Sequence, residues 1–87
     1  MKIKDGFVVR EIAGESIVIA LGEASKIFNG MIKLNETGRI IWDGLAKGED
    51  QETIIASILS EYDVAREIVE RDYNKFIDTL KGANILE

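Results

Sequence analysis

The sequence predicts an α+β domain in which a small antiparallel sheet precedes three helices. Two stretches near the start have the β-rich composition of strands, and a third, shorter one follows a loop. The rest of the chain carries apolar residues at helical spacing. Strands followed by helices are typical of the α+β class, and 87 residues suit one domain with a modest core. We therefore expect residues 1–87 to form a single domain.

The first two strands are expected to form a hairpin. Residues 7–13 are rich in β-branched and aromatic side chains, and residues 16–21 are almost continuously apolar. Between them, Gly14 and Glu15 suit a two-residue turn that begins with glycine. The returning strand is apolar on both faces, which indicates that helices cover one side of the sheet.

A loop over residues 22–30 leads to the third strand, residues 31–34. We expect Ile27 and Phe28 in this loop to tuck under the sheet. Because Trp42 must be buried nearby, Leu34 is expected to point inward. Period-two alternation gives the strand two faces, one with Ile32 and Leu34 and the other with Met31 and Lys33.

The first helix is expected over residues 36–47. Asn35 is a good N-cap, because its side-chain oxygen accepts from an amide of the first turn. Gly38 lies one turn in, where glycine costs roughly 1 kcal/mol relative to alanine. That cost indicates a packing reason, such as close approach of another backbone. Ile41 and Trp42 then supply a large buried surface.

The second and third helices are expected over residues 51–61 and 64–81, with Asp50 and Asp63 as their N-caps. Glycines end the helices, Gly48 the first and Gly82 the third. The second and third helices together resemble a helix-turn-helix, so the sheet and helices predict a winged-helix-like arrangement. The predicted core residues are Ile54, Ile55, Ile58 and Leu59 of the second helix, Ala65, Val69, Tyr73, Phe76 and Leu80 of the third, and Ile85 and Leu86 of a tail that folds back.

The composition argues against an enzyme. The chain has no Cys and no His, so it lacks thiolate chemistry, disulfides, and the commonest general base and metal ligand. Its acidic residues show no metal-site spacing, and we expect no cofactor, no metal and no catalytic residue. No apolar run has the length of a membrane span, and the N-terminus lacks a signal-peptide pattern. A cytoplasmic location without membrane contact is expected.

Charge argues against nucleic acid as the partner. Residues 49–87 hold four Lys or Arg and ten Asp or Glu, whereas residues 1–48 are nearly balanced. The helical half is therefore strongly acidic. A duplex binder needs Lys and Arg facing phosphates, so a winged-helix DNA-binding protein is the less favoured alternative.

The order of motifs resembles the PqqD-like family, small peptide-chaperone domains also called recognition elements for ribosomally synthesised and modified peptides (RiPPs). The segment Leu34 to Trp42 carries the resemblance best, as Leu-Asn-x-Thr-Gly-x-x-Ile-Trp. The remaining motifs follow in order: Asp43, Gly44 and Leu45 with Gly48; the Ile-rich second helix; Tyr62, Asp63 and Val64; and Glu70, Arg71 and Asp72 with Phe76, Ile77 and Leu80. The resemblance implies a non-catalytic protein that binds a precursor peptide.

The resemblance also implies where the peptide binds. In similar proteins the leader of the precursor adds as an extra strand to the third strand, beside the third helix. The expected peptide-binding residues are Gly30, Met31, Ile32, Lys33 and Leu34 of the edge, and Ile68, Arg71, Asp72, Lys75 and Thr79 of the helix. The alternative is that the opposite flank of that helix, with Arg66 and Ile77, lines the peptide groove.

Other interpretations of the same features are open. A lysine on an edge strand, such as Lys33, also serves to prevent pairing with other chains, in which case the edge has no binding function. Arg71, Asp72 and Lys75 have the spacing of a solvated ion-pair ladder. The edge would also suit a structural subunit that dimerises through it, and we expect a monomer or weak homodimer. Under the resemblance, the second partner is a maturation enzyme, often of the radical SAM type with an auxiliary iron–sulfur (SPASM) domain.

Overall fold

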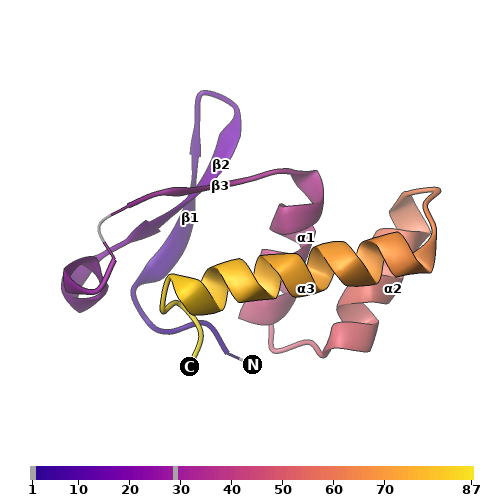
Figure 1. Ribbon diagram of the computed structural model, residues 1–87. Helices are drawn as coiled ribbons and strands as arrows, with labels where there is room; N and C mark the ends of the chain where they lie inside the picture. Colours follow the sequence, from indigo (N-terminus) through magenta and orange to yellow (C-terminus); the bar gives the residue numbers. More distant parts are fainter. Residues whose placement is uncertain (1, 29) are drawn as a thin grey trace.

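The computed structural model describes residues 2–28 and 30–87, and it confirms the predicted α+β architecture. A three-stranded antiparallel sheet of order β1-β2-β3 precedes three helices (Figure 1). The elements are β1 (Phe7–Ile12), β2 (Glu15–Ala20), a 3-10 helix (Gly22–Lys26), β3 (Ile32–Leu34), α1 (Glu36–Ala46), α2 (Gln51–Glu61) and α3 (Arg66–Gly82). Within the described ranges, no helix combines the length and apolarity that crossing a bilayer requires.

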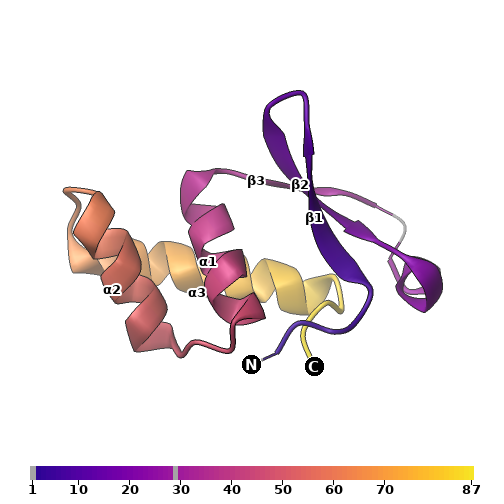
Figure 2. The ribbon, with the colours of Figure 1, turned by 180° about the vertical axis from the view of Figure 1, so that it is seen from behind.

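The helices α1 and α2 lie on the same side of the long helix α3, as seen from behind in Figure 2. The two ends of the chain lie side by side. Ile3 and Leu86 form an isolated bridge, and the Lys4 N–H donates to the Ile85 carbonyl at 2.8 Å. Ile85 and Leu86 are buried, which confirms the tail that folds back onto the core.

The hairpin turn lies one residue earlier than predicted. Ile12 pairs with Glu15, so the two turn residues are Ala13 and Gly14 rather than Gly14 and Glu15. Both have positive φ, 53° and 80°, as in a type I′ turn. This turn follows the right-handed twist of the strands, and that gain outweighs the cost of a positive φ at alanine.

The loop before β3 follows the prediction only in part. Phe28 is half-buried, and its ring centroid lies 6.0 Å from that of Phe7 in the core. Ile27 is exposed, so its predicted burial is wrong. Ile27 is the C-cap residue of the 3-10 helix, and its backbone N–H donates to the Ala24 carbonyl.

The third helix begins later than predicted, and its buried stripe keeps Val69, Tyr73 and Leu80 of the predicted core. Its N-cap is Ala65, which is exposed, so Asp63 is not the cap and Ala65 is not in the core. The buried stripe contains Ile77, at 4% exposure, where Phe76 was predicted. Phe76 is only partly buried at the side of the core. Its ring lies toward the β3–α1 junction, 3.6 Å from the position of a Cβ at Gly38. The buried residues of α3 are Val69, Tyr73, Ile77 and Leu80.

Among the glycines of the helices, Gly44 and not Gly38 is the position where an added Cβ would lie nearest to another atom. A Cβ added at Gly44 would lie 2.5 Å from Cγ1 of Ile54, which shows that α1 and α2 touch there. At Gly38 the nearest neighbours are side chains, with Oδ1 of Asn35 at 3.1 Å and Cε1 of Phe76 at 3.6 Å. The packing reason expected at Gly38 is therefore the approach of side chains, not of another backbone.

The N-cap of α2 is as predicted and makes a pH-dependent contribution to stability. The backbone N–H of Thr53 donates to Asp50 Oδ1 at 2.8 Å, and this bond lowers the pKa of Asp50 below its ordinary value of 3.8. A lowered folded-state pKa gives stability that is present above 3.8 and is lost as pH falls through the folded value.

We expect the stability advantage of the wild type over Asp50→Asn to shrink in acid. Asparagine also caps helices, but it does not titrate. Urea midpoints of both proteins, measured from neutral pH to about pH 2, test this expectation. A constant difference between the two midpoints across that range would contradict the role of the Asp50 carboxylate.

Candidate functional site

The third strand, β3, has a free outer edge. It pairs with β2 on one side, and no further strand lies beyond it in the described part of the chain. The Leu21 N–H donates to the Gly6 carbonyl at 2.7 Å, which fixes which residues of β2 face β1. Every second pair is hydrogen-bonded in an antiparallel ladder, so Ile17 faces β1, and Ser16 and Val18 face β3.

This alternation determines which backbone groups of β3 are exposed. Ser16 pairs with Leu34 and Val18 with Ile32, so the N–H and C=O of Ile32 and Leu34 point toward β2. Lys33 lies between them, and its N–H and C=O point away from the sheet into the open edge. An unpaired donor and acceptor of this kind form a template for another strand.

The side chains of β3 follow the predicted alternation. Leu34 is buried, and Ile32 packs against the core. The Lys33 side chain is exposed on the other face, where its Nζ lies 2.7 Å from the Glu15 carboxylate. The predicted inward direction of Leu34 is confirmed.

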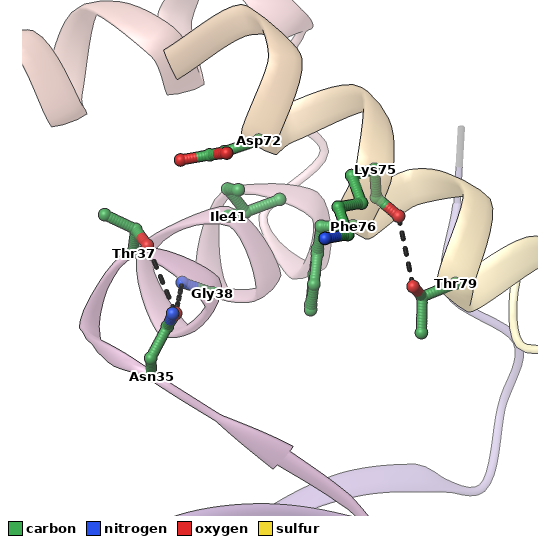
Figure 3. Close-up of a pocket in the computed structure, with 8 residues that line it drawn as sticks. All are labelled: Asn35, Thr37, Gly38, Ile41, Asp72, Lys75, Phe76 and Thr79. Carbon is green, nitrogen blue, oxygen red and sulfur yellow. Dashed lines mark hydrogen bonds between the residues drawn. The ribbon is translucent and has the colours of Figure 1, made fainter. Parts of the chain in front are cut away.

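A groove of about 300 Å³ separates the start of α1 from α3 (Figure 3). The Asn35 side chain accepts from the Gly38 N–H at 2.8 Å and so caps α1 at the mouth of the groove. Phe76 points from α3 into the space between the two helices. The lining residues are Asn35, Thr37, Gly38, Ile41, Asp72, Lys75, Phe76 and Thr79.

Gly38 lies where three elements approach one another beside the groove. A Cβ there would lie 3.6 Å from the Phe76 ring and 3.7 Å from Cδ2 of Leu34. The end of β3, the first turn of α1 and the middle of α3 therefore meet at one glycine. The missing side chain lets these three elements pack closely where the groove lies.

Comparison with known proteins identifies the family. Residues 9–86 match the family model described as coenzyme PQQ synthesis protein D (PqqD). The chain belongs to the PqqD family. No curated protein matches the chain.

Two solved structures resemble this PqqD-family chain. One is described as TbiB1 in complex with the TbiA(beta) leader peptide; it is 33% identical, with a TM-score of 0.81 over 100% of this chain and 95% of that one. The other is described as lasso peptide synthetase B1 complexed with the leader peptide; it is 21% identical, with a TM-score of 0.80 over 99% of this chain and 95% of that one. The second shows a shared fold.

The structure brings most of the expected site residues of this PqqD-family chain to one side. Asp72, Lys75 and Thr79 line the groove, and Ile68 borders a second cavity next to it. Arg71 lines neither. At the edge, Gly30 and Met31 are exposed and continue the line of β3.

The contribution of α1 and Phe76 to the groove was not predicted. Asn35 was identified only as a cap, and Phe76 was assigned to the core. The signal that could have found them is the glycine at residue 38, because the Asn35 and Phe76 side chains pack against it.

The opposite flank of α3 is already occupied by α2. The Arg66 guanidinium lies 2.6 Å from one Glu52 oxygen and 2.7 Å from the other, and it also contacts Glu70. Ile77 is buried. This flank therefore packs within the domain, and the flank with Asp72 and Lys75 faces the groove.

The ion-pair ladder on α3 is not formed. Among the described residues, Arg71, Asp72 and Lys75 take part in no ion pair. The charges of Asp72 and Lys75 stand at the wall of the groove and form no ion pair within residues 2–28 and 30–87. A negative and a positive charge are thus available to a peptide bound in the groove.

Proposed function

We propose that this chain is a non-catalytic adaptor that binds the leader of a ribosomally synthesised precursor peptide and presents it to a modifying enzyme. The observation that carries the proposal is the outward N–H and C=O of Lys33 beside the groove. The 33%-identical structure of TbiB1 with a leader peptide supports it, because a similar chain binds a ligand of this class.

In this proposal the leader adds to β3 as a fourth strand. Main-chain bonds to Lys33 supply affinity without regard to sequence, and side-chain contacts supply selection. The edge residues are Gly30 to Leu34, and the α3 residues are Ile68, Arg71, Asp72, Lys75 and Thr79. Asp72 and Lys75 select peptides that place a charge of opposite sign next to each of them. Without such a charge, each side chain would face the peptide without an ion-pair partner.

The second partner in the proposal is a maturation enzyme, with the radical SAM class carrying a SPASM domain as the first candidate. Binding of the leader must be reversible, because the modified product has to leave. The chain then acts by raising the local concentration of the precursor at the enzyme.

The leader of the precursor peptide encoded nearest to this gene is the probe. Fluorescence anisotropy of the labelled leader is expected to show saturable binding, whereas a scrambled leader of the same composition is expected to bind at least about tenfold more weakly, or 1.4 kcal/mol. Equal binding of the two peptides, or no binding of either, would overturn the proposal.

A second copy of the chain is the competing occupant of the same edge. Edge pairing with itself and edge pairing with a peptide use the same backbone groups of Lys33. Sedimentation at two protein concentrations separates them. A dimer that persists on dilution and excludes the leader would favour a structural subunit instead of an adaptor.

A further inference from the structure

The groove beside β3 contains two charged side chains, one of each sign. Asp72 and Lys75 line it, and its other lining residues are uncharged. Both residues are exposed on α3, and Figure 3 shows the Asp72 carboxylate pointing away from the Lys75 side chain. The groove therefore carries a fixed order of charge along α3, with the negative charge first and the positive charge three residues later.

The direction of β3 determines the order in which a bound peptide meets these two charges. The strand β3 runs toward Asn35 at the start of α1, whereas α3 runs the opposite way, from Asp72 to Thr79 (Figures 1 and 3). Both strand pairs of the sheet are antiparallel, and a strand added to β3 in the same manner runs opposite to β3. Such a peptide follows the direction of α3, so its N-terminal part lies beside Asp72 and its later residues lie beside Lys75.

The spacing of Asp72 and Lys75 matches one repeat of an extended strand. Three residues of a helix advance by about 4.5 Å along its axis. Alternate residues of a strand share one face and lie about 6.8 Å apart. The lysine side chain is longer and more flexible than that of aspartate, and it covers the difference. Adjacent peptide residues point to opposite faces, so the two peptide side chains that meet Asp72 and Lys75 are two positions apart.

We propose that the groove selects a leader peptide in which a basic residue is followed, two positions later, by an acidic residue. This inference rests on the proposed function and specifies the class of peptide that the site takes. Lysine or arginine of the peptide pairs with Asp72, and aspartate or glutamate pairs with Lys75. The reversed order would place like charges together at both positions, and each of these contacts lowers the affinity.

The order of charge also selects the direction of the added strand. The backbone N–H and C=O of Lys33 bond to a peptide in parallel as well as in antiparallel addition, so they do not fix its direction. A peptide with the basic residue first meets both Asp72 and Lys75 with opposite charges only when it runs antiparallel to β3. The two side chains on α3 thus supply the polarity that the backbone bonds lack.

Fluorescence anisotropy with two labelled peptides of identical composition tests the inference. The first is the leader encoded nearest to this gene, which we expect to contain the basic and acidic residues at this spacing, and the second has those two residues exchanged. The wild-type protein is expected to bind the exchanged peptide roughly tenfold more weakly. Equal affinities, or a leader that binds without such a pair, would overturn the charge order and leave the adaptor function standing. Binding of neither peptide would overturn the adaptor function and the inference with it.

A protein variant with the two charges exchanged assigns the selection to α3. Asp72→Lys combined with Lys75→Asp keeps the net charge, and this variant is expected to prefer the exchanged peptide roughly tenfold. The matched control, Asp78→Lys with Lys81→Asp, makes the same exchange at the same spacing on α3, at residues that line neither the groove nor the second cavity. It is expected to keep the wild-type preference. A folded groove variant that still prefers the original leader, or a control that reverses the preference, would overturn the inference.

Discussion

Replacing Lys33 by proline is expected to weaken leader binding by about tenfold or more while the domain stays folded. The Lys33 N–H points out of the sheet, so proline removes no bond of the β2–β3 ladder. It does remove the donor that an added strand needs, and its ring occupies the space where the peptide backbone would lie. Titration calorimetry with the leader measures the change.

Lys33→Thr is the matched control for the proline variant. It deletes the exposed pair with Glu15 and keeps the backbone N–H, so binding should stay within about twofold of wild type, given the small value of exposed pairs. Proline at Ile32 is the wrong test, because that N–H points toward β2 and its loss would damage the sheet. A folded Lys33→Pro variant with unchanged affinity would rule out strand addition.

Replacing Gly44 by alanine is expected to destabilise the fold by roughly 2 kcal/mol. The new Cβ would lie 2.5 Å from Cγ1 and 2.9 Å from Cδ1 of Ile54, and 3.0 Å from Oε1 of Glu49. Ile54 is buried and cannot move aside without shifting α2. Overpacking therefore outweighs the gain in helix propensity. Urea unfolding should show the loss, together with a fall in Tm of roughly 8–16 °C.

Gly82→Ala is the control for Gly44. A Cβ at Gly82, in the last turn of α3, meets no atom within 4 Å. The substitution should be neutral or stabilise by up to about 1 kcal/mol, because alanine lowers the entropy of the unfolded chain. Similar losses at Gly44 and Gly82 would show that α1 and α2 do not touch as described.

The elements set by local chemistry were predictable. The N-cap Asp50 and the apolar spacing of Ile54, Ile55 and Ile58 specify α2 without reference to the rest of the chain. The same is true of Asn35 at the start of α1. Each signal is a short-range hydrogen bond or a repeat on one helix face, and both are written in adjacent residues.

The errors arose where tertiary packing decides. The hairpin turn contains Ala13 at a positive φ, which local preference disfavours and strand twist requires. Whether Phe76 or Ile77 is buried in α3 depends on the neighbouring elements, because the helix pattern alone allows both. Gly44 was missed because its importance comes from Ile54 on a different helix.

Part of the candidate site was predictable from the sequence, and part was not. The free edge of β3 and the flank with Asp72, Lys75 and Thr79 were predicted, because strand order and helix phase suffice to suggest them. The groove itself requires three elements to converge on Gly38, and the second cavity requires three helices to meet beside Ile68. Convergence of this kind becomes visible only in the assembled fold.

Amide hydrogen exchange at β3, with and without saturating leader peptide, tests strand addition most directly. Strand addition predicts that the Lys33 amide exchanges fast in the free protein and slowly in the complex. Ile32 and Leu34 serve as internal references, since their N–H groups already face β2. Protection gained at Lys33 beyond that at the two references would establish the added strand. Unchanged exchange at Lys33 in a saturated complex would contradict it.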